Sequence, residues 1–207
     1  MRATGATSLK GTMASKTGER KQQILQQLAQ MLEEPHASRV TTAALAREMG
    51  LSEAALYRHF ASKAQMFEGL FDFIESTVFD LINQITAHEN DGRQQAYQIA
   101  MMLLAFAERN RGLTRLLTGH ALVTEDERLQ ERIAHIADRI DATFRQCMRD
   151  AITSGTLPAT LPATAIANML THLVMGSWLR FAQSGWQVLP TLHAKEQLRL
   201  IFEGCPG

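Results

Sequence analysis

The sequence lacks the marks of several common protein classes. It has two cysteines among 207 residues, Cys147 and Cys205, which is too few for a disulfide framework. The seven histidines have no cysteine or carboxylate partner at metal-ligand spacing, so we expect reduced thiols and no metal site. No run approaches the roughly 20 apolar residues that a membrane-spanning helix needs. These absences exclude a disulfide scaffold, a zinc module and an integral membrane protein.

Catalytic patterns are also missing. The sequence contains no glycine-rich phosphate loop and no spacing that suggests a nucleophile with its base, so we expect neither an enzyme nor a bound cofactor. Residues 1–16 contain no apolar segment, which indicates a flexible tail rather than a signal peptide.

The net charge is zero, but the charges are unevenly distributed. Residues 1–66 carry nine Lys and Arg against five Glu, whereas the remainder carries 12 basic against 16 acidic residues. A basic N-terminal third on an acidic body indicates that one end of the molecule meets a polyanion such as DNA.

Apolar residues recur at the helical period along almost the whole chain, and no alternating strand pattern is present. The sequence therefore predicts an all-α fold of nine helices. The expected helices run from near Thr17 to before Pro35, from the Thr41 and Thr42 cap to Gly50, from the Ser52 cap to Phe60, from the Ser62 cap through Ile85, over 96–107, 112–122 and Leu129 to Met148, from after Pro162 to about Gln183, and from about Thr191 to Phe202.

The stretch GLSEAALYRHFASK, residues 50–63, predicts the second half of a helix-turn-helix. On a helical wheel Leu56 and Phe60 point inward, while Ala54 and Arg58 lie on the opposite face. Small alanines would let the helix backbone enter a major groove, and Tyr57, Arg58 and His59 would offer donors to the flanking phosphates. The alternative is a packed helical hairpin with an incidental polar face.

The last two expected helices contain more apolar surface than one side of a surface helix requires. Ala167, Gly176 and Ser177 are small enough to let another helix approach closely. We expect a symmetric homodimer in which these two helices form a four-helix bundle with those of a second copy. An ordinary intrachain core is the alternative.

Residues 17–67 resemble the N-terminal domain of the TetR family of bacterial regulators, because LYRHF at 56–60 and SK at 62–63 match that family's pattern. The resemblance implies a helix-turn-helix domain at 17–64 and a helical dimerisation and partner-binding domain at 65–207. It also implies that phosphates are held by Thr41, Thr42, Tyr57, His59 and Lys63, and that Ala43, Ser52, Glu53 and Ala55 lie where bases are read. Ala43 and Ala44 stand where a family member may carry an arginine, so direct base readout is expected to be limited, with Tyr57, Arg58 and DNA shape sharing the specificity.

Four segments, RVTTAALA, GLSEAALYRHF, FIEST and AERNRGLTRLLTGHAL, are similar to one branch of that family, the SlmA-like nucleoid occlusion factors. The similarity implies a cytoplasmic, nucleoid-associated protein that binds palindromic sites in double-stranded DNA. When bound to DNA, members of this branch engage the division GTPase FtsZ and block ring assembly over the chromosome.

A partner site is expected on the fourth and fifth helices. Phe73 and Ile74 would supply an apolar anchor, and Met102, Arg109 and Asn110 a polar edge, for a short extended segment of FtsZ. Leu81 and Ala105 depart from the arginine and glycine that the resemblance leads us to expect. In the alternative reading, Phe73 and Met102 simply belong to the core.

The second functional hypothesis is a TetR-type repressor controlled by a small apolar effector. Its pocket would be lined by side chains of the fifth and eighth helices: Met101, Met102, Phe106, Met169, Met175 and Trp178. A cavity of several hundred cubic ångströms opening toward the domain interface would favour this hypothesis, and a filled core would favour the division inhibitor.

Overall fold

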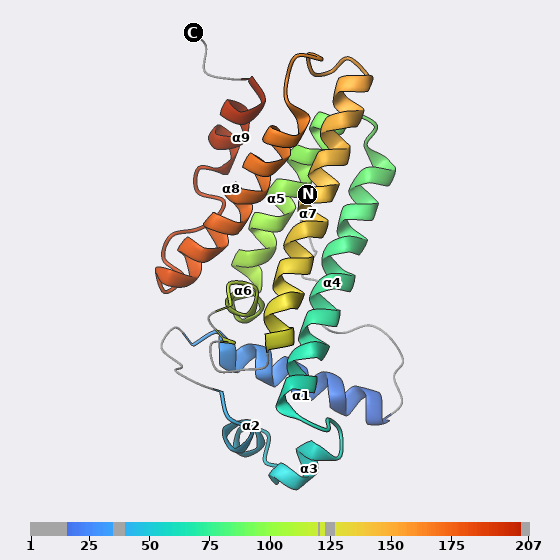
Figure 1. Ribbon diagram of the computed structural model, residues 1–207. Coiled ribbons are helices and arrows are strands. Elements are labelled where there is room, and N and C mark those ends of the chain that lie inside the picture. Colours follow the sequence, from blue (N-terminus) through green and yellow to red (C-terminus); the bar gives the residue numbers. More distant parts are fainter. Residues whose placement is uncertain (1–15, 35–39, 120, 123–126, 204–207) are drawn as a thin grey trace, which may run out of the picture.

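The computed structural model describes residues 16–34, 40–119, 121–122 and 127–203, and every regular element in these ranges is helical (Figure 1). The prediction of an all-α fold is therefore confirmed. The described helices are α1 (Lys16–Leu32), α2 (Thr42–Glu48), α3 (Glu53–Tyr57), α4 (Lys63–His88), α5 (Gly92–Arg109), α6 (Arg111–Leu117), α7 (Glu127–Thr153), α8 (Ala163–Gln183) and α9 (Ala194–Glu203).

Hydroxyl side chains fix where α2, α3 and α4 begin. Each oxygen of Thr41, Ser52 and Ser62 accepts a hydrogen bond from the backbone N–H three residues later, at 3.1, 3.2 and 3.1 Å respectively. These bonds satisfy N–H groups that would otherwise have no partner in the first turn. The three caps expected from the sequence are confirmed.

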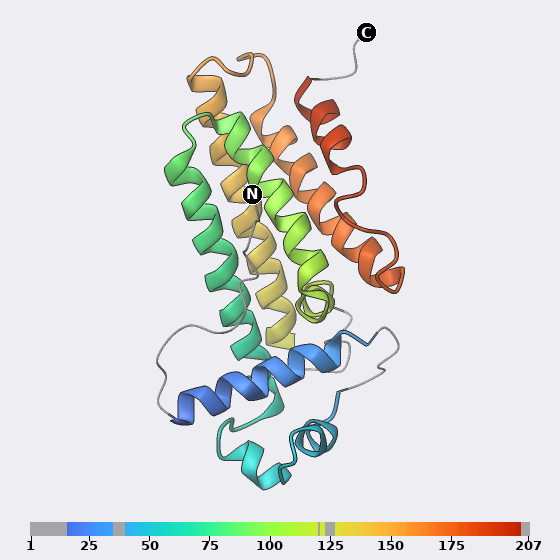
Figure 2. The ribbon, with the colours of Figure 1, turned by 180° about the vertical axis from the view of Figure 1, so that it is seen from behind.

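The first three helices lie together at one end of the molecule (Figures 1 and 2). α1 crosses the end of the helical bundle, and α2 and α3 lie beyond it. Their shared core contains Ile24, Leu45, Leu56 and Phe60, all buried. Gly50 joins α2 to α3 with φ of +63°, a left-handed conformation that suits glycine.

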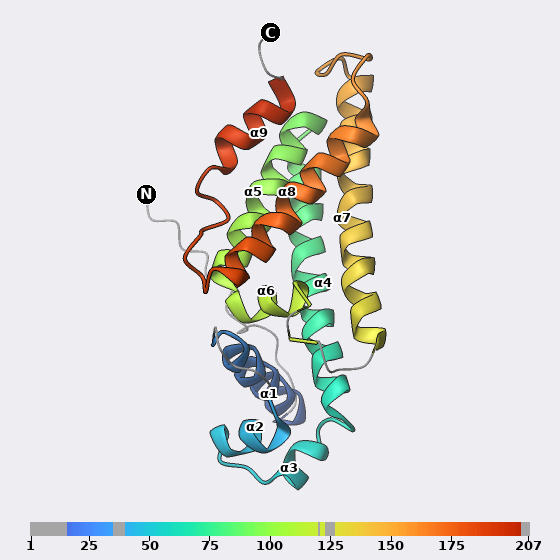
Figure 3. The same ribbon diagram turned by 60° about the vertical axis from the view of Figure 1, so that its left-hand side comes forward.

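Helices α4, α5, α7 and α8 form the long bundle, with α6 near its lower end and α9 against its outer side (Figure 3). Side chains such as Phe144 on α7 fill its centre and are fully buried. The indole N–H of Trp178 on α8 donates to the carbonyl oxygen of Leu103 on α5 at 3.1 Å, which satisfies a polar group inside this apolar core.

Several of the predicted helix limits were wrong, among them the end of α3, which lies at Tyr57 rather than Phe60. α5 begins at Gly92 rather than Ala96, because the Asp91 carboxylate caps its first turn by accepting from the Arg93 N–H at 2.8 Å. Gly92 lies so close to α7 that a Cβ there would be 2.1 Å from the carbonyl oxygen of Cys147. α6 ends at Leu117 rather than 122, because Gly119 leaves the helix with φ of +77°. Leu122 is nevertheless buried, so its apolar character reports packing and not helix length.

Several sequence expectations concern residues outside those described. The predicted tail at 1–16 has only Lys16 inside the described ranges, and Cys205 also lies outside them. The boundary expected between residues 64 and 65 falls in the first turn of α4, which runs without interruption from the first domain into the bundle. Among the described residues, no helix is both long and apolar enough to cross a bilayer.

Candidate functional site

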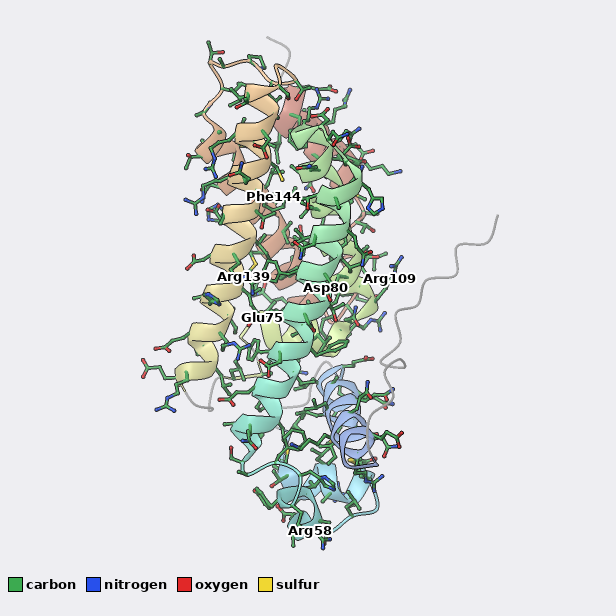
Figure 4. The ribbon with its side chains drawn as sticks, turned by 90° about the vertical axis from the view of Figure 1, so that its right-hand side faces the viewer. Arg58, Glu75, Asp80, Arg109, Arg139 and Phe144 are labelled. Atoms are coloured by element: carbon green, nitrogen blue, oxygen red, sulfur yellow. The ribbon has the colours of Figure 1, made fainter. Side chains whose placement is uncertain are left out.

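The side chains expected to meet DNA gather around the starts of α2, α3 and α4, at the tip of the molecule where Figure 4 shows Arg58. Most are accessible: the side chains of Thr41, Ala43, Ser52, Glu53 and Arg58 are exposed, and Tyr57 is 44% exposed. Thr42, Ala55, His59 and Lys63 are half-buried. The inward pair Leu56 and Phe60 is buried as the wheel predicts. All ten expected side chains thus belong to one end of the molecule.

Hydrogen bonds tie the start of α2 to α3. The hydroxyl of Thr42 donates to the carboxylate of Glu53 at 2.7 Å, and the Tyr57 hydroxyl donates weakly to Thr42 at 3.5 Å. Three side chains of the candidate DNA face therefore hold one another, which reduces the conformational freedom lost when a ligand orders them.

His59 and Lys63 sit where this face meets the domain core. Nδ1 of His59 is buried, and no other described residue forms a hydrogen bond with it. The Lys63 ammonium lies 5.4 Å from the centre of the Phe67 ring, a cation–π contact at the start of α4. A phosphate at this place would meet a cation beside the N-terminal end of a long helix.

A groove of about 1150 Å³ runs along the junction between the two domains, and we call it the junction groove. It is bounded by α1 on one side and by α4, α5 and the start of α6 on the other. Its lining includes Lys21, Leu25, Ala29, Glu33, Phe73, Thr77, Leu81, Met102, Ala105, Phe106, Arg109, Asn110 and Leu113. The lining is mainly apolar, with the cations of Lys21 and Arg109 among it.

The structure places four of the five expected partner contacts in the junction groove. Phe73 and Met102 are half-buried, Arg109 is exposed near the end of α5 (Figure 4), and Asn110 follows it. Ile74 is the exception. Its side chain is 0% exposed and belongs to the core, so its expected role as a surface anchor is wrong. Adjacent helical residues point about 100° apart, and only Phe73 of this pair faces the groove.

Most of the side chains named in the effector hypothesis do not line the junction groove. Of its six side chains, only Met102 and Phe106 line the junction groove. Trp178 is buried within the core, and Met169 is 53% exposed on α8. The groove itself, however, has the volume and the position at the domain interface that the hypothesis requires.

A charged network between α4 and α7 was not anticipated from the sequence. The Glu75 carboxylate, 18% exposed, accepts from the guanidinium groups of Arg132 at 2.6 Å and Arg139 at 2.8 Å. Figure 4 labels Glu75 on α4 and Arg139 on α7. Burial acts to lower the pKa of Arg132, but hydrogen bonds and charge from Asp72 and Glu75 outweigh it and raise that pKa overall. The Arg139 guanidinium also stacks 3.6 Å from the centre of the Phe79 ring. This network joins α4, the helix that leaves the first domain, to α7.

An exposed apolar surface covers α8, α9 and the segment between them. Its members are Met169, Leu179, Val188, Leu189, Leu192 and Leu200, which are between 36% and 61% exposed. A shallow hollow of about 310 Å³ lies within it, lined by His172, Gly176, Arg180 and residues of the connecting segment. Val188, Leu189 and Leu192 line this hollow together, and exposed apolar side chains gathered in this way are typical of a protein–protein interface.

Comparison with known proteins agrees with this arrangement. Residues 24–70 match the family described as bacterial regulatory proteins of the tetR family, and residues 93–204 match the SlmA-like, tetracyclin repressor-like C-terminal domain. The nucleoid occlusion factor SlmA of Vibrio cholerae is 46% identical over 183 residues, covering 88% of this chain and 93% of that protein. The Aliivibrio fischeri protein of the same name is 45% identical over the same shares of both chains.

Solved structures show the same fold at low identity. The fatty acid degradation regulator FadR from Bacillus halodurans has a TM-score of 0.77 at 14% identity, covering 94% of this chain and 98% of that one. Together with the tetR family match of residues 24–70, this similarity confirms the predicted TetR-like fold, in which the described residues form three helices in the N-terminal domain and six in the C-terminal domain. From the match over most of its length, this chain belongs to the SlmA family of nucleoid occlusion factors within the TetR regulators.

Proposed function

We propose that this protein binds palindromic sites in double-stranded DNA as a homodimer on the nucleoid in the cytoplasm. When bound to DNA, it engages FtsZ and inhibits assembly of the division ring over the chromosome. The observation that carries the proposal is the position of the junction groove, which lies where the two domains meet and is bounded by α1 of the first domain and by α4, α5 and α6 of the second.

The DNA-binding part is supported by the chemistry of the α2 and α3 starts. Thr41, Thr42, Tyr57, His59 and Lys63 supply hydroxyls, an imidazole and a cation for phosphate contacts, with Arg58 at the tip. The short side chains of Ala43, Ser52 and Ala55 allow α3 to lie deep in the major groove, and Glu53 can accept from a base amino group.

The FtsZ-binding part is supported by the lining of the junction groove. Phe73 and Met102 offer an apolar surface to an extended segment, and Arg109 can pair with a carboxylate in bidentate fashion. The side-chain N–H of Asn110 donates to the carbonyl oxygen of Phe106 at 2.8 Å and so caps the end of α5. The amide oxygen of Asn110 can then accept a hydrogen bond from a peptide N–H of the partner.

The homodimer is supported by the exposed apolar surface on α8 and α9. Packing two copies through these helices would form a four-helix bundle and remove Met169, Leu179, Leu192 and Leu200 from water. In this proposal residues 17–64 bind DNA, and residues 65–207 dimerise and bind the partner.

The decisive experiment is sedimentation of polymerised FtsZ from the same organism in the presence of this protein. It is run with and without the duplex that the protein selects from a randomised library. We expect loss of FtsZ polymer only when that duplex is present. Tyr57→Ala should weaken DNA binding across all sequences and remove inhibition with it.

Arg109→Asp should leave DNA binding unchanged and abolish inhibition. Arg111→Asp is the matched control, because Arg111 is also exposed but does not line the junction groove. Polymer that persists with the wild-type protein and its duplex would reject the FtsZ proposal. Equal effects of the two arginine substitutions would reject the assignment of the groove.

The volume of the junction groove favours a second candidate, a repressor whose small apolar effector binds there. In that case a medium-length fatty acid or a similar amphiphile should release the duplex from the protein at micromolar concentration, whether or not FtsZ is present. Release of the duplex by such an amphiphile, together with FtsZ polymer that persists in the presence of the DNA-bound protein, would select the repressor over the division inhibitor.

A further inference from the structure

The carboxyl end of α1 is attached to the C-terminal domain through bonds to its backbone. The indole N–H of Trp186, in the segment between α8 and α9, donates to the carbonyl oxygen of Glu33 at 2.7 Å. The guanidinium of Arg115 on α6 donates to the next carbonyl, that of Glu34. Because both bonds end on the main chain, they fix the position of α1 itself and not merely of one side chain.

The backbone at Trp186 is strained in a way that directs its ring toward α1. Trp186 has φ of +70° and directly follows Gly185, whose φ is +61°. It is the one residue other than glycine with a positive φ among those that the structure describes. Such a conformation is unfavourable for a large side chain and persists only where the surroundings hold it.

Two contacts hold the ring there. Trp186 is 6% exposed, and its ring packs edge-to-face on Phe181 of α8, with 5.0 Å between the ring centres and an angle of 65°. Its backbone N–H also donates to the carbonyl oxygen of Phe181 at 3.0 Å. The indole is therefore held in one orientation and bridges the ends of α8 and α1.

The same segment carries part of the exposed apolar surface. Val188 and Leu189, two and three residues beyond Trp186, are 36% and 44% exposed. The Ser184 hydroxyl accepts from the backbone N–H groups of Gln187 and Val188, at 3.1 and 2.9 Å, and so closes this segment into a compact turn. One short, hydrogen-bonded turn thus joins the proposed dimer surface to the first domain (Figure 3).

We infer that Trp186 is a positioning residue that sets the orientation of each DNA-binding domain relative to the dimer surface, and thereby the half-site spacing that the dimer accepts. In a two-fold dimer the distance between the two α3 helices follows from the angle at which each first domain sits on its bundle. The inference rests on the proposed homodimeric DNA binding. It adds that a residue far from DNA determines which palindromes are bound.

The test compares Trp186→Phe with Trp178→Phe in the full-length protein. Both substitutions keep an aromatic ring and remove one indole N–H that donates to a backbone carbonyl. Only the bond of Trp186 leads to α1, whereas that of Trp178 stays inside the bundle and ends on Leu103. The probes are the palindromic duplex that the wild-type protein selects and versions with one to three base pairs added to or removed from its centre.

We expect the wild-type protein and Trp178→Phe to bind the selected spacing best and to lose affinity steeply as the spacing changes. Trp186→Phe should reduce that discrimination by about three- to tenfold, the effect of one lost hydrogen bond. A role confined to general stability would instead weaken binding to all spacings by the same factor.

A second measurement does not depend on DNA. Spin labels on Glu48→Cys, at the exposed end of α2, are introduced in a Cys205→Ser background, and the distance between the two labels of a dimer is recorded. Trp186→Phe should broaden that distance distribution, and Trp178→Phe should leave it unchanged.

The possible failures are separable. A wild-type protein that is monomeric or ignores its duplexes refutes the proposed function and this inference together. A wild-type dimer that binds DNA, with an unaltered spacing profile and label distribution in Trp186→Phe, refutes the inference alone.

Discussion

Replacing Gly112 by alanine should separate α1 from α6. Gly112 lies in the first turn of α6, buried against α1, and a Cβ there would lie 1.9 Å from the carbonyl oxygen of Ala29 and 3.3 Å from Cβ of Leu32. An ordinary carbon–oxygen contact is on the order of 3.3 Å, so the backbones must move apart by more than 1 Å. The obstacle is main chain, which cannot rotate out of the way as a side chain can.

The expected cost follows from that displacement. Overpacking of a close-packed interior costs about 1–3 kcal/mol, and the gain in helix propensity from Gly to Ala offsets at most about 1 kcal/mol of it. Moving α1 would also lengthen the bond from Trp186 to Glu33, worth about 1 kcal/mol. We expect Gly112→Ala to lower the free energy of unfolding by roughly 1–3 kcal/mol and to weaken DNA binding.

Urea unfolding followed by circular dichroism gives the free energy of unfolding. Tryptophan fluorescence reports any change in the environment of the Trp186 indole. Gly69→Ala is the matched control. Gly69 on α4 also faces α1, but its Cβ would meet only the methyl ends of the Leu25 side chain, at 3.0 and 3.2 Å, which can move. We expect that variant to unfold within about 1 kcal/mol of the wild type. If Gly112→Ala were as stable as Gly69→Ala, the close packing of α1 on α6 would not exist in solution.

Three further predictions concern other parts of the molecule. Gly176→Ala adds a Cβ with nothing within 4 Å in one protomer, so it should stabilise an isolated chain by about 0.5–1 kcal/mol. If α8 packs on a second copy, analytical ultracentrifugation should instead show a weaker dimer, and an unweakened one would count against that interface. Glu75→Gln should lower the free energy of unfolding by about 1–3 kcal/mol, because it leaves Arg139 without its carboxylate and Arg132 with that of Asp72 alone, whereas Asp72→Asn, at a side chain that is 71% exposed, should change it by less than about 0.5 kcal/mol. Burial, aided by the charge of Asp150, raises the pKa of the Cys147 thiol to about 11. The folded protein therefore retains the thiol proton that the unfolded chain loses near pH 9, and the stability of the wild type relative to Cys147→Ala should fall between about pH 9 and 11. A constant difference over that range would contradict the burial of this thiol.

Local signals were sufficient for much of the fold. A hydroxyl residue before an apolar periodic stretch identifies an N-cap because its oxygen needs only backbone N–H groups within the same turn, so Thr41, Ser52 and Ser62 could be placed without tertiary information. The inward direction of Leu56 likewise follows from the helical period and a neighbouring helix alone.

What the sequence could not supply depends on which helices become neighbours. Glutamate is a typical surface residue, so nothing in the sequence marks Glu75. Only the packing of α7 against α4 brings Arg132 and Arg139 to it. Trp186 lies outside any periodic pattern, and its contact with α1 spans 153 positions of the chain. Ile74 was misplaced because an apolar residue next to a groove residue resembles a surface anchor until the bundle core is known.

The bond between Thr42 and Glu53 has a consequence for how the protein discriminates among DNA sequences. A threonine hydroxyl possesses one hydrogen, and in the free protein that hydrogen is shared with Glu53 at 2.7 Å. If Thr42 donates to a phosphate, the Glu53 carboxylate loses this hydrogen bond and lies unpaired beside the negative charge of the DNA. Only a base that presents an amino group, such as cytosine, can compensate it. In the proposed complex, a duplex that does not place an adenine or cytosine amino group at this position would leave the carboxylate uncompensated, so Glu53 would disfavour binding to most other sequences.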